Sequence, residues 1–320
     1  MEIKNILISM LSPFENHIAN GGEKILGNAS SIKRTPDGRV YISGQMQRHA
    51  LFSAMERIND NDPNKGETYV SNGDGVTNFV EKDLRADLGG FMHPSKNDYS
   101  GRRTAPLSAT MAISVSSDHS EDLTFEESKI GRDLLVRLKQ DLNIGDDSKK
   151  QALATKEFSE YDLMHMNFSL EVGAMGTSKA FEYGGKSMHL GTSYFLHTQP
   201  EERKRRARLF IEAAMSLNDY ANQARNMVSG EPQQILLVFD TKVSRKAARF
   251  FQAGEKEREN ILSELNGRGA KVFYGNDKAG NVSVYQAKIQ ALAFLEDNQL
   301  SNPAGDDAEV KEYAKFAGEG

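Results

Sequence analysis

The sequence predicts an α+β fold, an antiparallel sheet with helices on one face, in a ferredoxin-like arrangement. Apolar residues alternate or run together in four short stretches typical of strands: Glu2–Met10, Pro106–Ser116, Tyr161–Val172 and Ile235–Phe239. Helical spacing of apolar residues follows the first stretch, in Gln45–Ile58, and the third, from Thr198 onward. The resulting order, strand–helix–strand–strand–helix–strand, is that of a ferredoxin-like fold.

The two helices of this order carry start signals. Ser43 directly precedes the first and is a suitable N-cap. Before the second, Thr198 and Glu201 have the spacing of a capping box with Pro200 in the first turn, and the apolar face continues to about Ser229. Beyond the last strand we expect three further elements: a helix near Glu255–Leu265, a hairpin of Lys271–Tyr274 with Val282–Tyr285, and a helix ending near Glu296.

Three segments interrupt this body, which we expect to comprise residues 1–58, 106–172 and 196–296. Residues 59–105 are rich in Asn, Asp, Gly and Pro and predict an inserted subdomain, and about 121–159 predict a helical insertion. Residues 173–195 contain five glycines with Met and aromatic residues between them, which predicts a hairpin with apolar residues at its tip. Residues 297–320 are acidic and we expect them to be disordered.

Composition excludes several classes of protein. The chain has 320 residues, 38% hydrophobic and 27% charged, and no cysteine. A disulfide scaffold, a cysteine-ligated metal and a cysteine nucleophile are therefore excluded. The longest clean apolar run, Ile235–Phe239, is far shorter than the roughly 20 residues that span a bilayer. With no signal-like start in Met1–Met10, we expect a cytoplasmic protein without membrane contact.

Charge is unevenly distributed along the chain. The net charge is −5, and residues 291–320 alone carry seven acidic residues against two lysines, which accounts for all of it. Within the rest, Lys24–Arg57 holds six cations and two acids. A chain that is acidic overall can therefore still present a local basic surface to an anionic ligand.

Motifs for nucleotide binding and for catalysis are either in the wrong structural context or missing from the sequence. Ala180–Ser187 (AFEYGGKS) matches a relaxed phosphate-binding loop, and Ile235–Asp240 could supply a Mg²⁺-binding aspartate. The loop motif works only between a strand and a helix, whereas Met188–Thr192 predicts strand or loop. The seven histidines show no zinc-protease spacing, and no nucleophile-elbow motif occurs. We expect no cofactor and no metal.

Two segments suggest a polyanion ligand. Arg203–Arg206, with Arg208, places five cations in the first turns of the second helix, which is either a solvated basic face or an anion site. In Asn28–Phe52, Lys33 and Arg34 precede a turn, and a strand then leads to a helix start with Ser43, Gln45, Arg48 and His49. Hydroxyl, amide and cationic groups beside free helix amides suit phosphate and ribose oxygens. From these residues alone, an ordinary capped helix explains the segment equally well.

The run Arg39–His49 (RVYISGQMQRH) resembles the R-x-x-I-S-x-Q-x-x-K/R-R signature of the backbone subunit of type I CRISPR Cascade complexes. The Asn/Gly-rich loop with Lys33 and Arg34, and the insertion before Pro106, resemble the DevR branch of this RAMP superfamily, typical of type I-B systems. The resemblance is strongest over Ile3–Ile58 and only general beyond Ser229. One departure is His49, which stands where the family commonly has a basic residue.

The resemblance implies an RRM-like palm with an inserted finger (59–105) and a protruding thumb hairpin (173–195). It implies a non-catalytic protein of which several copies polymerise along the spacer of a guide RNA (crRNA), beside other Cascade subunits. Sequence would then be read by pairing between the guide and target DNA. The residues implied to contact RNA are the following: Lys33, Arg34, Ser43, Gln45, Arg48, His49, Arg102, Arg103, Met175, Lys179, Phe181, Lys186 and Arg203.

Within that set, Met175 and Phe181 would wedge between bases, and Lys179 and Lys186 would hold the adjacent phosphates. Two alternatives stay open. One is a related endoribonuclease, either guide-processing or cutting target RNA as a type III subunit, for which His17, His49 and Asp37 are the nearby candidates, with no evident pairing among them. The other is a phosphate-loop NTPase that uses Ala180–Ser187.

Overall fold

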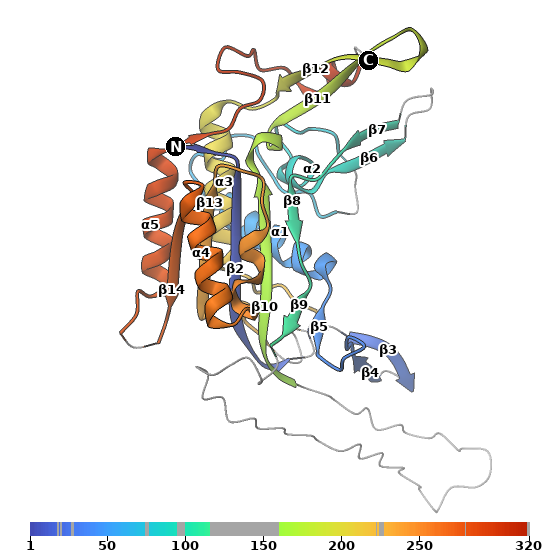
Figure 1. Ribbon diagram of the computed structural model, residues 1–320. Coiled ribbons are helices and arrows are strands. Elements are labelled where there is room, and N and C mark those ends of the chain that lie inside the picture. Colours follow the sequence, from blue (N-terminus) through green and yellow to red (C-terminus); the bar gives the residue numbers. More distant parts are fainter. Residues whose placement is uncertain are drawn as a thin grey trace, which may run out of the picture.

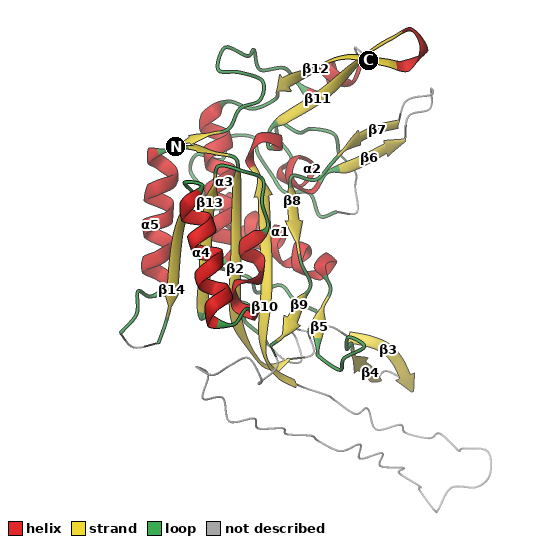
Figure 2. Cartoon of the chain, in the orientation of Figure 1, coloured by secondary structure: helices red, strands yellow, loops and turns green. Residues whose placement is uncertain are grey.

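A computed structural model describes residues 1–17, 19, 21–26, 29–73, 77–94, 100–115, 160–221, 223, 227–278 and 280–318. Its body is a seven-stranded sheet with helices packed on it, and smaller hairpins project from one side (Figures 1 and 2). The α+β class with an antiparallel sheet is therefore confirmed. The helical insertion predicted at about 121–159 lies outside the described residues.

All strand pairs of the sheet are antiparallel, and the order is β14-β13-β2-β10-β9-β5, with β8 also paired to β10. The bounds in chain order are β2 Asn5–His17, β5 Tyr41–Ile42, β8 Leu107–Ala109, β9 Ala112–Ser114, β10 Glu160–Glu171, β13 Gln234–Asp240 and β14 Lys271–Asn276. The four stretches that the sequence marked as strands thus form its centre, and β14 and β5 extend it at the two edges.

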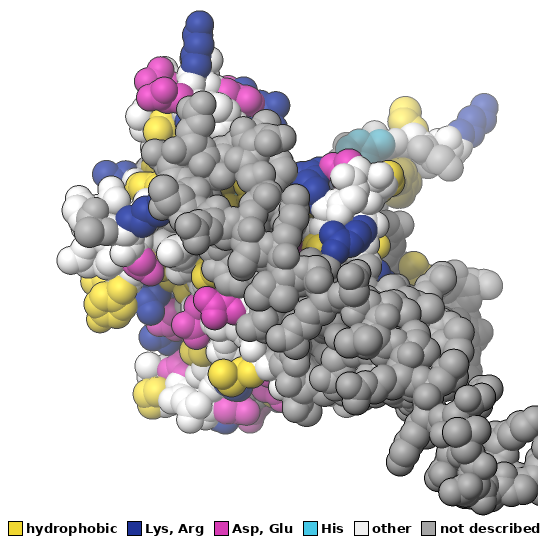
Figure 3. All heavy atoms as spheres, turned by 90° about the horizontal axis from the view of Figure 1, so that it is seen from below, with side chains coloured by type: hydrophobic (Ala, Val, Ile, Leu, Met, Phe, Trp, Pro, Cys, Tyr) yellow, Lys and Arg dark blue, Asp and Glu magenta, His cyan; other side chains and the backbone are white. Residues whose placement is uncertain are grey.

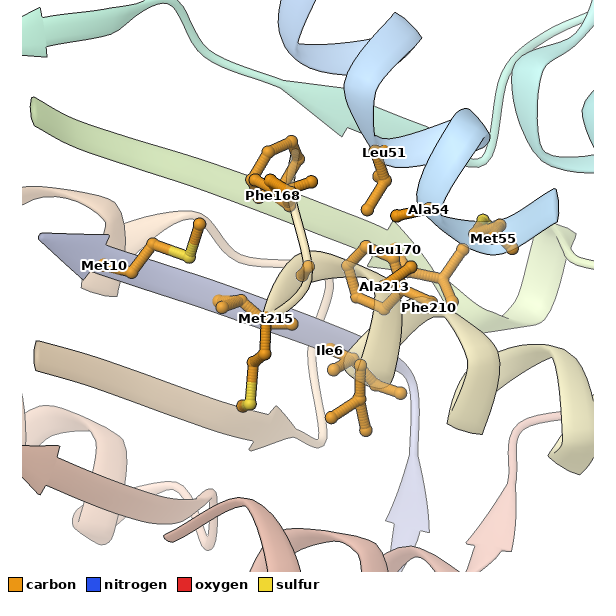
Figure 4. Packing of buried hydrophobic residues seen from close by; sticks show 14 of the residues in the cluster. Ile6, Met10, Leu51, Ala54, Met55, Phe168, Leu170, Phe210, Ala213 and Met215 are labelled. Atoms are coloured by element: carbon orange, nitrogen blue, oxygen red, sulfur yellow. The ribbon is translucent and has the colours of Figure 1, made fainter. Parts of the chain in front are cut away.

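Helices cover both faces of the sheet, where the sequence predicted one. On β2, Ile6, Ile8 and Met10 pack into a core with α1 (Gly44–Asp60), α3 (Pro200–Ala214) and α5 (Val284–Asp297). Figure 4 shows this core, with side chains of β2 and β10 meeting those of α1 and α3. Leu7 and Leu11 point the other way, into a second core with the 3₁₀ segment η5 (Lys246–Gln252) and α4 (Glu255–Gly267). Successive side chains alternate between faces, so the buried run β13 feeds both cores.

Both helix starts test the capping signals. Ser43 is the N-cap of α1 and accepts the Met46 amide at 3.3 Å, as predicted. The capping box at Thr198 is wrong. Gln199 is the last extended residue before α3 and becomes its N-cap, so Thr198 lies one position too early. The helix also ends at Ala214. The later apolar residues Leu217 and Tyr220 lie in non-helical chain and are buried there. They are apolar because they pack into the core, and their spacing does not reflect a longer helix.

The C-terminal part differs from prediction in two places. Val282–Tyr285 is not a strand, because Ser283 forms a capping box with Gln286 and starts α5; β14 pairs with β13 instead. Residues 297–320 were expected to be disordered, yet β15 (Gln299–Leu300) pairs with β1 (Glu2–Ile3), and α6 spans Tyr313–Gly318. Tyr313 is 3% exposed, so an apolar anchor holds this acidic segment to the body.

Among the described residues, three hairpins project from the body, and a short helix beside them packs Leu84 and Leu88 into the core. They are β3–β4 (Gly21–Leu26, Ala29–Ile32), α2 (Leu84–Gly89), β6–β7 (Phe91–Pro94, Ser100–Arg103) and β11–β12 (Thr177–Gly184, Met188–Leu196). Short 3₁₀ turns, η3 (Val172–Ala174) and η4 (Gly185–Ser187), stand at the root and the tip of β11–β12. The hairpin predicted at 173–195 is thus present. Among the described residues, no helix is long and apolar enough to cross a membrane.

Candidate nucleic-acid interface

The predicted site residues separate into three places. Six lie in the loop before α1 and in its first turns: Lys33, Arg34, Ser43, Gln45, Arg48 and His49. Three lie on the exposed part of the β11–β12 hairpin: Lys179, Phe181 and Lys186. Three others are buried in the body: Arg103, Met175 and Arg203. The remaining residue, Arg102, pairs through its backbone with Met92 in the β6–β7 hairpin.

The start of α1 presents polar groups in a fixed geometry. Gln45 and His49 are exposed and one helical turn apart, so they lie on the same side of α1. Lys33 and Arg34 are exposed, and the Arg34 guanidinium donates to the Gly38 carbonyl at 3.0 Å. A Cβ at Gly44 would lie only 3.2 Å from the Ala109 carbonyl oxygen. Because glycine has no side chain, α1 can start directly against β8. The sheet therefore positions this group rigidly.

Arg48 is half-buried and has a structural contact. One of its Nη atoms donates to the Gly89 carbonyl at 2.7 Å, which ties α1 to the end of α2. Burial lowers the pKa of this guanidinium from its ordinary value. A guanidinium has five N–H donors, so this bond leaves others for a ligand.

The β11–β12 hairpin exposes an unusual amount of apolar surface. Phe181 is 50% exposed, Tyr183 62%, Met188 61% and Leu190 61%. The rings of Phe181, Tyr183 and His189 lie 5.8–6.2 Å apart, and Lys179 Nζ sits 4.8 Å from the centroid of the Phe181 ring. Grouped rings beside a cation are the chemistry that stacks bases and holds phosphates. Phe181, which we expect at the apolar tip of the hairpin, is thus exposed, and Lys179 beside it is exposed as well.

The surrounding surface is mixed in charge. Figure 3 shows lysine or arginine side chains close to acidic ones across the visible described surface, and a slender projection that carries apolar, histidine and cationic side chains. On this face, the described cations do not form one continuous basic surface.

The phosphate-loop reading of Ala180–Ser187 fails on the fold. Ala180–Gly184 belongs to β11, and Gly185–Ser187 forms the hairpin turn, with Lys186 at φ 60° and ψ 34°. Strand β12 follows directly, so no helix N-terminus faces the lysine. Lys186 is exposed at the tip of the hairpin, where it can reach a ligand outside the body.

Met175, Arg103 and Arg203 are not surface contacts, contrary to prediction. Met175 is fully buried at the hairpin root. Arg203 is 2% exposed and donates to the carbonyls of Val172, Met175 and Ser301 at 2.7–2.9 Å. Arg103 is 8% exposed and donates to Ala174, Thr177 and Asp87. The two arginines therefore satisfy backbone carbonyls where the sheet passes into the hairpin.

Asp87 is the acid that Arg103 and Arg206 meet, and sequence reasoning missed it. Its carboxylate receives hydrogen bonds from Arg103, from Arg206 at 2.5 Å and from the Gly176 amide at 2.9 Å. Burial alone would raise its pKa, but Arg103 and Arg206 outweigh it and hold the pKa below the ordinary value of 3.8. We call Asp87, Arg103, Arg203, Arg206 and Gly176 the root cluster.

The other cations of the basic run are held by contacts within the molecule, and of these Lys204 and Arg208 stay partly exposed. Arg206 is fully buried and Arg205 is 8% exposed. Arg205 bonds Asn59 and Asp62, Arg208 reaches Asp62 at 2.6 Å, and Glu202 pairs with both Arg205 and Arg206. Neither a solvated face nor a polyanion site describes this run. The five cations of α3 outnumber its three acids, and that excess was the available signal for acidic partners elsewhere.

The nuclease candidates are arranged differently from expectation. His17 does have a partner: its Nε2 lies 2.8 Å from Asp162 in the paired strand β10, but the ring is fully buried. His49 is exposed, and Asp37 receives bonds from Thr35 and Arg39 in its own turn. Within the described ranges, no three potential ligand side chains gather as a metal site.

Comparison with known protein families identifies the family of this chain. The family model described as CRISPR-associated negative auto-regulator DevR/Csa2 matches residues 8–244, most of the chain. The chain therefore belongs to the DevR/Csa2 family of CRISPR-associated proteins. No curated protein matches it.

Two solved structures are similar along nearly the whole chain. One, a CRISPR RNA-guided surveillance complex, has a TM-score of 0.45 and 11% identity, covering 98% of this chain and 99% of the other. The second, a surveillance complex before nicking, has a TM-score of 0.47 and 11% identity, covering 91% and 99%.

Proposed function

We propose that this protein is a non-catalytic, guide-RNA-binding backbone subunit of a type I Cascade effector. Several copies would assemble along the spacer beside other Cascade subunits, and base pairing with the guide would select target DNA. The observation that carries the proposal is the exposed ring cluster on the β11–β12 hairpin, in a chain of the DevR/Csa2 family.

The sheet supports an RRM-like palm. Taking β2, β8 with β9, β10 and β13 as strands one to four, their spatial order is four–one–three–two. Helix α1 connects strands one and two, and α3 connects strands three and four. That connectivity is ferredoxin-like. In the same terms, β11–β12 corresponds to a thumb and the segment containing α2 and β6–β7 to a finger.

The contact chemistry favours sequence-independent binding. Exposed rings stack on any base, and the cations Lys179 and Lys186 suit phosphates that every guide possesses. The group at the start of α1, with Lys33, Gln45 and His49 exposed, would hold the backbone nearby. A subunit repeated along a variable spacer needs contacts of this kind.

A binding and footprinting experiment tests the proposal. The purified protein should carry RNA of discrete length and should protect two unrelated guide RNAs with the same periodic pattern. Phe181→Ala with Tyr183→Ala should weaken binding to both guides equally. Tyr285→Ala is the matched control, because Tyr285 is 66% exposed on α5 of the body.

The same reactions separate binding from cleavage. End-labelled guide and target RNA should remain intact during incubation with or without divalent metal ions. The burial of His17 is consistent with that outcome, because a general base must reach its substrate. Products that disappear in His49→Ala or Asp37→Asn would instead establish the endoribonuclease alternative.

A further inference from the structure

We propose that the C-terminal segment Gln299–Tyr313 is a strap that fixes the direction of the β11–β12 hairpin and so positions its ring cluster for RNA. The inference rests on the proposed function only for the RNA part. The mechanical part concerns the hairpin itself.

The strap is joined to the body at its first end. Leu300 pairs with Ile3 through β15 and β1, and the Ser301 amide donates to the Ile3 carbonyl at 2.8 Å. The Ser301 carbonyl receives Arg203 at 2.7 Å, and Arg203 also bonds the Val172 and Met175 carbonyls before the hairpin. One guanidinium thus joins the strap to the chain that enters β11.

At its other end the strap joins the chain that leaves β12. Val310 forms a parallel bridge with Leu196, and the Lys311 amide donates to the Leu196 carbonyl at 2.8 Å. His197 Nδ1 donates to the Lys311 carbonyl at 2.7 Å. The strap therefore acts as a partial third strand beside the root of a two-stranded ribbon.

Tyr313 extends this link to the inserted segment. Its ring is 3% exposed and lies edge-on to His197 at 5.5 Å and to Phe91 of β6 at 5.3 Å. Its amide donates to the Glu81 carboxylate at 3.4 Å. Tyr313 thus stands between the hairpin root and the chain around α2 and β6, and holds one against the other.

The hairpin is a long arm, so a small rotation at its root moves its tip a long way. An isolated two-stranded ribbon is marginally stable and free to swing. Eight residues of β11 extend about 26 Å, so a swing of about 10° at the root displaces the tip by about 4–5 Å. Such a displacement exceeds the spacing of stacked rings and bases, so ring placement depends on the root being held.

The chain contains no cysteine, which permits clean distance measurement by paired spin labels. Labels would be placed at Gly185→Cys on the tip, where a Cβ meets nothing within 4 Å, and at Lys256→Cys, exposed on α4. The test variants are Tyr313→Ala and a chain ending at Ala308. The controls are Glu312→Ala, an exposed neighbour in the strap, and Tyr285→Ala.

Without RNA, the tip-to-body distance distribution should be narrow in wild type and in both controls. It should broaden by several ångströms in both test variants, while far-ultraviolet circular dichroism stays native. An unchanged width in Tyr313→Ala and in the shortened chain would overturn the strap. If the shortened chain fails to fold, Tyr313→Ala alone decides.

The effect of the strap on RNA binding is measured in a separate experiment. Tyr313→Ala should retain guide binding through the body but lose the regular spacing of protected nucleotides. A wild type that binds no RNA would refute the proposed function and leave the distance result intact. Broadening without any change in protection would mean that the strap does not position the hairpin for RNA, and would overturn that part.

Discussion

The root and the tip of the β11–β12 hairpin are only a few residues apart in sequence and have opposite surroundings. At the root, Met175 is fully buried, and Asp87 receives the Gly176 amide and two arginines. At the tip, Phe181 and Tyr183 are at least half exposed. A segment can therefore be anchored like a core and end in a surface that its own body does not cover. This is the construction expected of an arm that works on something outside the molecule.

The largest expected effect comes from Asp87→Asn. The substitution leaves Arg103 and Arg206 buried without their carboxylate, so we expect unfolding to become easier by about 3–5 kcal/mol. Denaturant titration followed by circular dichroism measures it. The control is another carboxylate-to-amide change, Glu182→Gln, near the tip of the hairpin. Because Glu182 is exposed, this substitution should leave the stability unchanged.

The pKa of Asp87 also predicts how the stability of the protein changes at acidic pH. The folded-state pKa of Asp87 lies below its ordinary 3.8. Its stabilisation is therefore present above about pH 4 and is lost as pH falls through the folded-state value. Asp87→Asn should flatten that part of the stability curve. A variant as stable as wild type, with the same acid slope, would show that the root cluster does not anchor the hairpin.

Two glycines give a second contrast. Gly176 has φ +66°, and a Cβ there would lie 2.1 Å from Thr198 Oγ1, whereas Gly185 at the tip has open space. Gly176→Ala should cost about 2–4 kcal/mol, from left-handed strain and overpacking combined. Gly185→Ala should cost nothing or stabilise slightly. Thermal unfolding of the pair checks this, and equal melting temperatures would contradict the rigid root.

A third pair separates stability from binding. Met175→Ala removes a buried side chain and should cost about 2–5 kcal/mol of folding free energy with guide affinity lowered only through folding. Phe181→Ala should leave folding almost unchanged and weaken guide RNA binding by about 1–3 kcal/mol, the value of one base stacked on a ring. Filter binding and calorimetry on both variants test the contrast. Full affinity in Phe181→Ala would remove the tip from the interface.

The smallest effect concerns the start of α1. Arg48→Ala should weaken binding similarly for unrelated guides and lower the slope of log affinity against log salt by about one unit. Its bond to the Gly89 carbonyl also predicts a modest loss of stability. An unchanged salt slope with reduced stability would assign Arg48 to the α1–α2 contact alone.

Local signals in the sequence determined a large part of this protein. Alternating or continuous apolar stretches gave the central strands, because the side chains of these strands are buried against a core. Ser43 marked the start of α1, because a hydroxyl there satisfies a free helix amide. Phe181 was recognised as exposed because a glycine-rich ribbon beyond the sheet has no core of its own to bury it in.

Only the tertiary structure decided where the cations go. Arg203, Arg205 and Arg206 look like a basic surface on a helix, yet the acid that meets Arg206 is Asp87, 119 residues away along the chain. A charged side chain is buried when a distant partner compensates its desolvation, and helical spacing holds no record of that partner. The order of the acidic C-terminal segment also depends on residues that are distant in sequence. Tyr313 is an unremarkable residue in an acidic stretch until the fold brings His197 and Phe91 against it.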